Sequence, residues 1–409
     1  MSNILIFSYY ANLPGACQAE WIDDKIDAIK ELNINFSIVT SPSAAKIELA
    51  TNHYRAYSIG LKDFKDEFER CKVRKFSLFL MYIWFPIAFL IGGVFDLIQL
   101  IVTKGVGEGR WSWIITSFIS GFVLILKEGR PNYIFSTGGP ASAHVSAVLL
   151  GKLFDRKVII ELQDPLSGMD IGRNVRAKGF LFLLEKYLAN NVYKLVYVTK
   201  SAQKFARKQF NTDNISYIYP GARPFIDKKP KATTKKLGKL TLIHLGSLYS
   251  SRNFDTLLLA FDKIFNKKLM SPNELELINL GHVSDEIMSK IQKFNFIKVL
   301  KPVSRLEALN IASKCDILVL IQNNDSRSSV TIPYKTYDYL NLSLPILGLT
   351  NSNEIDDILT RCGGAMVAQV NDIDEITKKI IKIVRFRKEV KTRSTINYIK
   401  QARVLLNVD

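Results

Sequence analysis

The stretch Ile243–Arg252, IHLGSLYSSR, decides the fold of this chain. It completes an apolar run, Leu240–Leu245, which predicts a buried strand that stops at Gly246. A short polar loop with Arg252 follows, and an amphipathic helix is expected from Asp255. A junction of strand, loop and helix gathers free backbone N–H groups at the positive end of the helix, and this setting suits a phosphate.

A second stretch, Ile332–Leu340, reads IPYKTYDYL. It places Lys335 and Asp338 three residues apart, so that both lie on one face of a helix that Pro333 is suited to open. Together the two stretches are suited to hold both ends of a nucleoside diphosphate.

Apolar strands and amphipathic helices alternate along both halves of the chain, which indicates two doubly wound α/β domains. We expect a first domain at residues 1–220, a basic linker at 221–239 and a second domain at 240–390. A last helix, within residues 391–409, is expected to cross back onto the first domain. The expected strands are Ile4–Ser8, Phe36–Val39, Tyr133–Ser136, Val158–Leu162, Leu195–Val198, Leu240–Leu245, Leu275–Leu280, Lys298–Leu300, Ile317–Leu320 and Pro345–Leu349.

The composition limits the classes of function. The chain has 56 Lys and Arg against 38 Asp and Glu, a formal net charge of +18. A plain solvated surface or attraction to an anionic membrane accounts for such a charge, and no zinc-finger or ribonucleoprotein pattern points to nucleic acid. The 4 cysteines have no paired spacing, which indicates a reduced compartment without a disulfide framework or zinc site. No G-x-G-x-x-G fingerprint follows the first strand, which disfavours a nicotinamide or flavin cofactor.

One segment, residues 76–103, stands out because Phe76–Phe95 carries no charged residue. By length this run qualifies as a membrane span, but a single span would separate strands that belong to one sheet. A buried core helix is another interpretation. We expect a hairpin or broken helix that lies in the membrane interface. The chain also opens without a charged-then-apolar leader, so we expect a protein that is cytoplasmic and peripheral on the inner face of the cell membrane.

The two opening motifs resemble the C-terminal half of GT-B glycosyltransferases, close to glycosyltransferase family 4. The resemblance extends over nearly the whole chain and implies two Rossmann-like, doubly wound parallel-sheet domains facing a cleft. The family's Gly-Arg-Leu loop corresponds to Gly246-Ser247-Leu248, with Arg252 as the cation that follows. Its Pro-Ser-Lys-Leu-Phe-Glu-Tyr-Leu segment corresponds to the run from Pro333. The resemblance implies that Gly246, Ser247, Arg252 and Lys335 contact the donor phosphates and that Asp338 contacts the ribose.

Other positions extend or break the family pattern. Gly15 resembles the glycine loop with which GT-B enzymes approach the donor phosphate, although a plain tight turn explains it equally well. Gly281-His282 follows an expected strand, where the base or a phosphate would lie. Ser247 stands where the family has arginine, and Val330 stands where an acid is expected. The first change weakens the phosphate contact, and the second leaves the donor-sugar contact unassigned.

The first half resembles bacterial glycosyltransferases that act on lipid-linked sugars. The family's Pro-x-Ser-Ala-His helix start matches the run Pro140–His144, and its Arg-Asp-Pro/Leu loop matches Asp164-Pro165. His144 and Asp164 are therefore the candidate catalytic residues. Each candidate also has a structural interpretation, because a histidine at a helix start is often structural and an aspartate before proline suits a turn. In the same way Arg252 fits a surface cation, and Asp338 fits a solvated or capping carboxylate.

The sequence predicts a metal-independent glycosyltransferase. That the enzyme retains the stereochemistry of the donor sugar is implied by the family resemblance alone. It would move a sugar from a nucleotide diphosphate sugar to a lipid-linked or surface-polysaccharide acceptor, with no cofactor besides this donor. Asp372-Ile373-Asp374 precedes a helix and is interpreted as a cap instead of a metal site, and His244, inside an apolar strand, as a packed core residue. Two alternatives stay open: a GT-B sugar-nucleotide epimerase, and a non-catalytic membrane-bound subunit of a glycan assembly complex.

Overall fold

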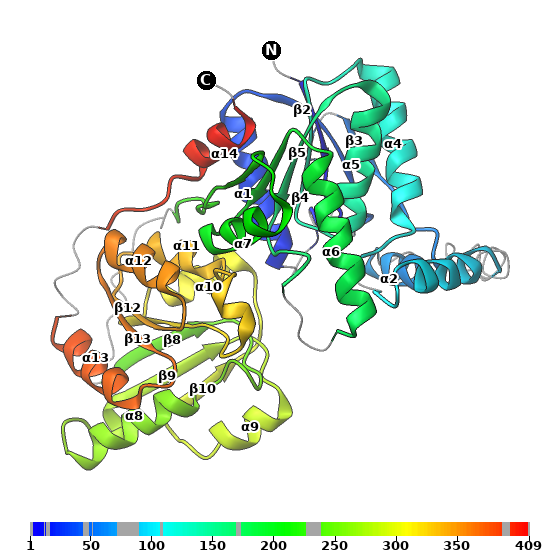
Figure 1. The fold of residues 1–409 in the computed structure, drawn as a ribbon. Helices are drawn as coiled ribbons and strands as arrows, with labels where there is room; N and C mark the ends of the chain where they lie inside the picture. The colour runs from blue at the N-terminus through cyan, green and yellow to red at the C-terminus, as the bar shows by residue number, and fades with distance from the viewer. Residues whose placement is uncertain are drawn as a thin grey trace. The chain divides into compact units, whose positions relative to one another are not determined.

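The computed structural model describes residues 3–11, 13, 17–43, 49–50, 52–71, 90–106, 109–168, 173–225, 239–386 and 393–407. The predictions for Gly15, for residues 76–89 and for most of the linker lie outside these ranges. The chain divides into two compact units, the first Met1–Pro220 with Tyr398–Asp409 and the second Gly221–Asn397 (Figure 1).

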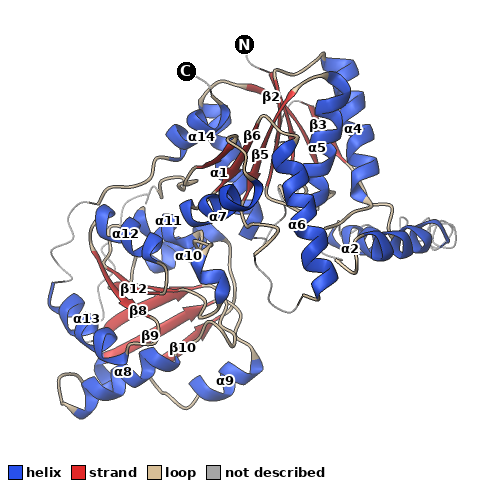
Figure 2. Ribbon diagram, viewed as in Figure 1, coloured by secondary structure: helices blue, strands red, loops and turns tan. Residues whose placement is uncertain are grey.

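The first unit is a parallel sheet with the strand order β3-β2-β1-β4-β5-β6-β7. Helices lie on both faces of the sheet (Figure 2). The strands are β1 Asn3–Phe7, β2 Asn35–Thr40, β3 Asn52–Arg55, β4 Tyr133–Thr137, β5 Lys157–Leu162, β6 Lys194–Tyr197 and β7 Ile215–Tyr217. The helices are α1 Cys17–Glu31, α2 Leu61–Arg70, α4 Trp113–Glu128, α5 Ala141–Phe154, α6 Val175–Asn190, α7 Lys200–Phe210 and α14 Tyr398–Leu406, and residues 90–102 are also helical.

The second unit has a parallel sheet with the strand order β10-β9-β8-β11-β12-β13. The strands are β8 Leu240–Leu245, β9 Leu275–Leu280, β10 Ile297–Leu300, β11 Ile317–Ile321, β12 Ile346–Thr350 and β13 Ala365–Gln369. The helices are α8 Asp255–Asn266, α9 Asp285–Ile291, α10 Arg305–Ala312, α11 Lys335–Leu340, α12 Asn353–Cys362 and α13 Ile373–Phe386, with short 3₁₀ turns at Pro272–Glu274 and Ser326–Ser329.

Each sheet has one point at which its strand order reverses. In the first unit the chain moves outward from β1 to β3 and then returns to place β4 on the other side of β1. In the second unit β8 and β11 are related in the same way. At such a point the loops that leave neighbouring strands diverge, and the gap at the carboxyl ends of the strands is where open α/β sheets bind ligands. The fold therefore offers one candidate site in each unit.

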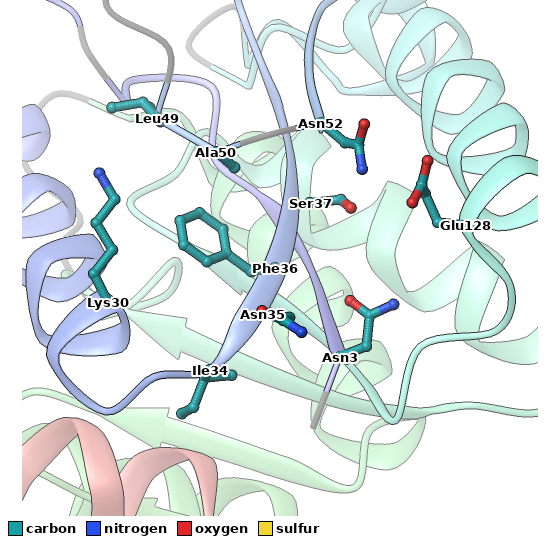
Figure 3. Close-up of a pocket in the computed structure, with 10 residues that line it drawn as sticks. All are labelled: Asn3, Lys30, Ile34, Asn35, Phe36, Ser37, Leu49, Ala50, Asn52 and Glu128. Carbon is teal, nitrogen blue, oxygen red and sulfur yellow. The ribbon is translucent and has the colours of Figure 1, made fainter. Parts of the chain in front are cut away.

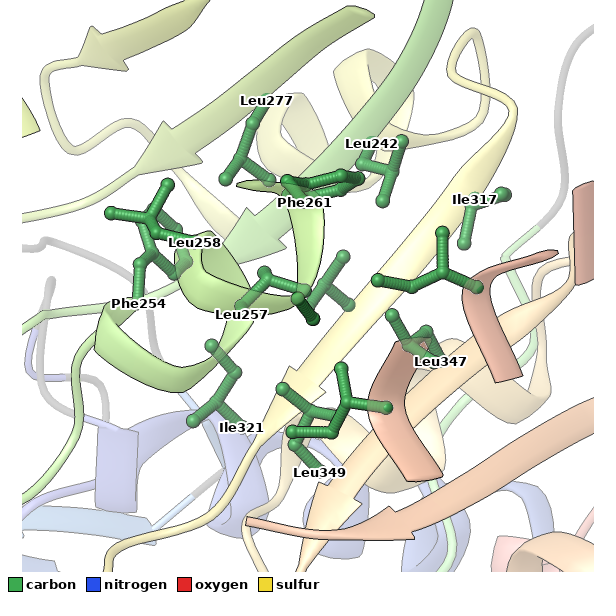
Figure 4. Close-up of a cluster of buried hydrophobic side chains, with 14 of the residues drawn as sticks. Leu242, Phe254, Leu257, Leu258, Phe261, Leu277, Ile317, Ile321, Leu347 and Leu349 are labelled. Carbon is green, nitrogen blue, oxygen red and sulfur yellow. The ribbon is translucent and has the colours of Figure 1, made fainter. Parts of the chain in front are cut away.

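The core of the second unit shows why the periodicity of the sequence predicts this fold. Figure 4 shows Leu257 and Phe261 of α8 among Leu242, Ile317 and Leu347 from three strands of the sheet. Full burial of such side chains contributes about 1.5–3 kcal/mol each. The helical spacing of the apolar residues in α8 thus fixes the helix on the sheet and sets the position of the loop before it.

Several expected elements agree with the structure, and some boundaries differ. Helix α11 spans the predicted residues, and Asp372 Oδ1 accepts a hydrogen bond from Glu375 N at 2.8 Å, as predicted for a cap. The last helix spans Tyr398–Leu406, within the predicted residues 391–409, and packs on α1, where Tyr398 Oη donates to Glu31 Oε1 at 2.7 Å. Within the described ranges, no helix is both long enough and apolar enough to cross a bilayer.

A half-buried guanidinium, that of Arg393, secures the carboxyl end of α11. Arg393 donates hydrogen bonds of 2.7–3.1 Å to backbone carbonyl oxygens that surround the end of this helix and the start of β12 and β13. The acceptors are Tyr339, Leu342, Leu344, Gly363 and Gly364. These bonds hold the helix that carries Lys335 and Asp338 against the sheet.

Replacement of Arg393 by methionine should lower the free energy of unfolding of the second unit by about 2–4 kcal/mol, because buried carbonyl groups lose charged donors. Arg361→Met is the matched control, since the Arg361 side chain is 74% exposed and pairs along its own helix with Asp357. That change should stay within about 0.5 kcal/mol. Urea unfolding followed by circular dichroism measures both, and equal effects would contradict the role given to Arg393.

Candidate functional site

The loop between β8 and α8 forms the first side of the candidate site in the second unit. Gly246 has φ +124°, and Gly281, at the end of β9, has φ +150°. A β-carbon added to Gly281 would lie 2.4 Å from the carbonyl oxygen of Gly246. Two glycines are therefore required here, because the chain leaving β8 crosses directly over the chain leaving β9.

Lys335 reaches from α11 into this loop. Its Nζ lies 2.7 Å from the carbonyl oxygen of Leu245 and 2.7 Å from His244 Nε2. A β-carbon added to Gly246 would lie 3.1 Å from the same nitrogen. The ammonium is thus fixed beside the backbone of the glycine that was predicted to approach a phosphate.

Arg252 supplies a second cation on the same loop. Its backbone forms a reciprocal pair with Tyr249, with both N–O distances at 2.8 Å, and its guanidinium lies over the Tyr249 ring at 5.3 Å from the centroid. Burial and the positive charges of Lys335 and Arg252 lower the pKa of His244 well below its usual range, against a hydrogen bond with Asn279. Both predicted phosphate ligands are therefore near enough to this buried imidazole to lower its pKa.

The other predicted residues of this site have different surroundings. Ser247 is half-buried in the loop, and His282 is exposed, with its carbonyl oxygen accepting from Leu248 N at 2.8 Å. Asp338 forms an ion pair with Arg305, in which Arg305 Nη2 lies 2.6 Å from Asp338 Oδ1. Arg305 also lies over the Tyr334 ring, 5.1 Å from its centroid. A ribose bound by Asp338 would have to share the carboxylate with this guanidinium.

Arg305 is one residue of this site that sequence reasoning missed. It is the first residue of α10, and Ser304 caps that helix by accepting from Glu307 N. The available signal was its position just after β10, at the same edge of the sheet as the other loops. No sequence spacing relates it to Asp338, because the two lie on different helices.

The candidate site of the first unit is a cavity of about 250 Å³ at the carboxyl ends of the strands. Both predicted catalytic residues, His144 and Asp164, line this cavity. Tyr10 follows β1 and Gly138 follows β4, so the cavity lies at the reversal of strand order. Its lining combines apolar, aromatic and hydrogen-bonding side chains, among them Val106, Trp111, Gln163, Leu166 and Arg173.

His144 is held rigidly in the first turn of α5. It is 1% exposed, and its Nδ1 lies 2.8 Å from Ser136 Oγ on β4. Burial lowers the pKa of His144 to about 3. The imidazole is therefore neutral near pH 7, where it is able to donate or accept one hydrogen bond. It carries no positive charge that would stabilise an anionic leaving group.

A buried carboxylate, Glu185 of α6, positions the loop that carries Asp164. Glu185 Oε2 accepts from Ser167 N at 2.6 Å and from Ser167 Oγ at 2.5 Å, and Tyr197 donates to the other oxygen. Burial raises the pKa of Glu185, while the bonds from Ser167 and Tyr197 oppose the rise. Asp164 itself is exposed. Sequence reasoning missed Glu185, since an isolated acid in an amphipathic helix carries no motif.

The first unit also has a larger cavity, of about 720 Å³ (Figure 3). It is bordered by Asn3, Asn35 and Asn52, which begin β1, β2 and β3, and therefore lies at the amino ends of the strands. None of the predicted site residues within the described ranges lines it. Among the described residues, no group of three or more His, Cys, Asp or Glu is arranged to hold a metal ion.

No protein-family model matches the chain, and no curated protein matches it in sequence. Solved structures do match over its whole length. The E. coli trehalose-6-phosphate structure bound with UDP-2-fluoro glucose has a TM-score of 0.62 at 10% identity, covering 100% of this chain and 96% of that one. The apo lipopolysaccharide outer core galactosyltransferase WaaB has a TM-score of 0.55 at 10% identity, with 100% and 99% covered. The UDP-GlcNAc 2-epimerase from Methanocaldococcus jannaschii has a TM-score of 0.55 at 13% identity, with 100% and 99% covered.

These similarities show the fold alone, and they confirm the predicted fold class. The chain has the GT-B architecture of two α/β domains, each built on a doubly wound parallel sheet. Membership of glycosyltransferase family 4 stays a prediction. Because proteins of this fold catalyse different reactions, the reaction has to be argued from the residues of the site.

The pKa of His144 predicts a pH effect on stability. Its folded-state pKa of about 3 lies below the unfolded value near 6.5, so unfolding takes up a proton as the pH falls below about 6.5. The free energy of unfolding of the wild type should therefore fall relative to that of His144→Gln between pH 7.5 and pH 5. The limiting slope is about 1.4 kcal/mol per pH unit. Tryptophan fluorescence during urea unfolding measures the free energy of unfolding of both proteins at each pH. If the two free energies changed with pH in parallel, the low pKa of His144 would be contradicted.

Proposed function

We propose that this protein is a glycosyltransferase that moves a sugar from a nucleotide diphosphate sugar to a lipid-linked or cell-surface polysaccharide acceptor. The observation that carries the proposal is the placement of Lys335 and Arg252 around the Gly246 loop of the second unit. The GT-B fold supports it, and so do the UDP and UDP-sugar complexes reported for structures of that fold.

The donor chemistry follows from the two cations. When the anomeric C–O bond breaks, negative charge develops on the departing diphosphate, and fixed donors that need no reorganisation stabilise it. Each charge-assisted hydrogen bond from Lys335 or Arg252 would contribute about 1.5–3 kcal/mol. The two glycines allow the phosphates to approach the backbone, where Ser247 and His282 border the loop. Asp338, shared with Arg305, is proposed to bind the ribose.

The acceptor is proposed to bind in the cavity of the first unit. Trp111, Val106 and Leu166 give this cavity aromatic and apolar walls. Asp164 is proposed to orient or deprotonate the acceptor hydroxyl. The neutral His144 is proposed to contact the sugar through one hydrogen bond. A cavity with apolar and polar walls fits an amphiphilic acceptor.

A bare aliphatic helix face supports placement of the protein on a membrane. Eight aliphatic side chains of helix 90–102 are at least 49% exposed, namely Leu90, Ile91, Val94, Leu97, Ile98, Leu100, Ile101 and Val102. At 3.6 residues per turn they cover an arc of about 200°. The opposite side packs on α2, where Asp96 accepts from Lys62 N and Gly92 lies against the backbone of Leu61. We propose that the bare face inserts into the lipid interface on the cytoplasmic side of the cell membrane.

A sugar-nucleotide epimerase is the second candidate function. The specific observation in its favour is the whole-length similarity to the M. jannaschii UDP-GlcNAc 2-epimerase. An epimerase consumes a nucleotide sugar without an acceptor, so incubation with UDP-GlcNAc alone distinguishes the two. Formation of a new nucleotide sugar in that incubation would replace the glycosyltransferase proposal.

Substitution of either phosphate-site cation tests the donor site. Lys335→Met and Arg252→Met should each weaken UDP binding about 10- to 100-fold, because each removes a charge-assisted hydrogen bond. Lys314→Met is the control, since Lys314 is exposed and precedes β11 at the amino end of the sheet. Titration calorimetry measures all three. Unchanged affinity in both site variants would remove them from the donor site.

A paired substitution tests the membrane surface. Leu97→Glu with Ile101→Glu should lower binding to vesicles that contain anionic lipid at least tenfold, because two charges would enter the apolar interface. Leu97 and Ile101 are 57% and 60% exposed, so the change is tolerated by the fold. The matched control is Leu153→Glu with Leu183→Glu, whose side chains are 57% and 64% exposed on α5 and α6. An equal loss of vesicle binding in both double variants, or no loss in either, would contradict the proposed surface.

A further inference from the structure

His244 uses both of its ring nitrogens at the carboxyl end of β8. The residue is 0% exposed, as is Asn279 on β9. Its Nδ1 lies 2.8 Å from Asn279 Oδ1, and its Nε2 lies 2.7 Å from Lys335 Nζ. The sequence predicted a packed core residue, and the burial agrees, but packing alone does not explain the polar chain from Asn279 to Lys335.

The hydrogen-bond partners define the form of this imidazole. Asn279 Nδ2 donates to the carbonyl oxygen of Gly281 at 3.4 Å, which orients Asn279 Oδ1 toward the ring as an acceptor. Nδ1 must therefore carry the proton, and the lone pair of Nε2 is left to accept from Lys335. The low pKa of His244 keeps the ring neutral, and only a neutral ring is able to accept this bond.

We propose that His244 and Asn279 are positioning residues for the diphosphate of the donor. They hold the Lys335 ammonium at the Gly246 loop, beside the place proposed for the phosphate oxygens. This inference rests on the proposed function of the same site. It adds that the affinity for the diphosphate depends on two buried residues that do not touch the nucleotide.

The physical benefit is a lysine that is ordered before the ligand arrives. A lysine side chain has large rotamer entropy, and its ordering opposes binding by about 1–2 kcal/mol when it occurs at the moment of association. Two acceptors, His244 Nε2 and the Leu245 carbonyl oxygen, fix the ammonium in advance. With the Leu245 carbonyl oxygen as its one acceptor, the ammonium would be free to rotate about that hydrogen bond. His244 Nε2 is a second acceptor and fixes the orientation.

A double-mutant cycle with UDP as the probe tests the inference. Titration calorimetry would compare the unaltered chain with His244→Leu, Lys335→Met and the double variant. We expect His244→Leu to weaken UDP binding about tenfold, which is about 1.4 kcal/mol. In the Lys335→Met background the same change should have no further effect, because the residue that it positions is gone. His244→Gln, which keeps an acceptor near the place of Nε2, should restore most of the affinity.

The outcomes separate the inference from the proposed function. Additive losses, or equal affinity of His244→Gln and His244→Leu, would overturn the positioning role and leave the donor site in place. An unaltered chain that does not bind UDP would overturn both. If His244→Leu does not fold, Asn279→Asp replaces it, since a carboxylate beside Nδ1 favours the charged ring, whose Nε2 is a donor. That variant should also bind UDP more weakly, and unchanged affinity would overturn the inference.

Discussion

The second unit depends on the fixed position of one ammonium group. Lys335 Nζ lies between the Leu245 carbonyl oxygen and His244 Nε2, directly beside Gly246. This arrangement requires a glycine at the end of β8, and a second one at Gly281 where the two chains cross. Helix α11 carries the lysine and is anchored to the sheet by Arg393. The position of the ammonium beside the Gly246 loop therefore depends on these few contacts.

The two units present different chemistry at the same topological position. Each has its candidate site where the strand order reverses and neighbouring loops diverge. In the second unit the cations Lys335 and Arg252 dominate, which suits a diphosphate. In the first unit a neutral histidine, His144, and the exposed Asp164 border a partly apolar cavity, which suits an uncharged sugar attached to a lipid. The proposals of a charged donor in the second unit and an amphiphilic acceptor in the first rest on this difference.

Much of the fold was predictable because apolar periodicity encodes burial directly. Helix α11 matches the expected residues, since proline before it and an apolar face within it are local signals. The short strand β3 and the helix α6 were missed, because they carry mixed polar and apolar residues without a clear period. Helix α2 was also missed, although Leu61, Phe64 and Phe68 recur in it at helical spacing. Glu185 and Arg305 were missed for another reason, since their roles come from partners on other elements.

The sequence by itself determined that two α/β sheets form, that Arg252 lies in the loop after β8, and that Lys335 lies on the helix that follows Pro333. These features depend on local spacing and on the parallel order that βα alternation imposes. Only the tertiary structure decided that Asp338 is held by Arg305, and that His244 connects Asn279 to Lys335. Such contacts join residues on separate strands and helices, and their geometry exists only after the sheet has assembled.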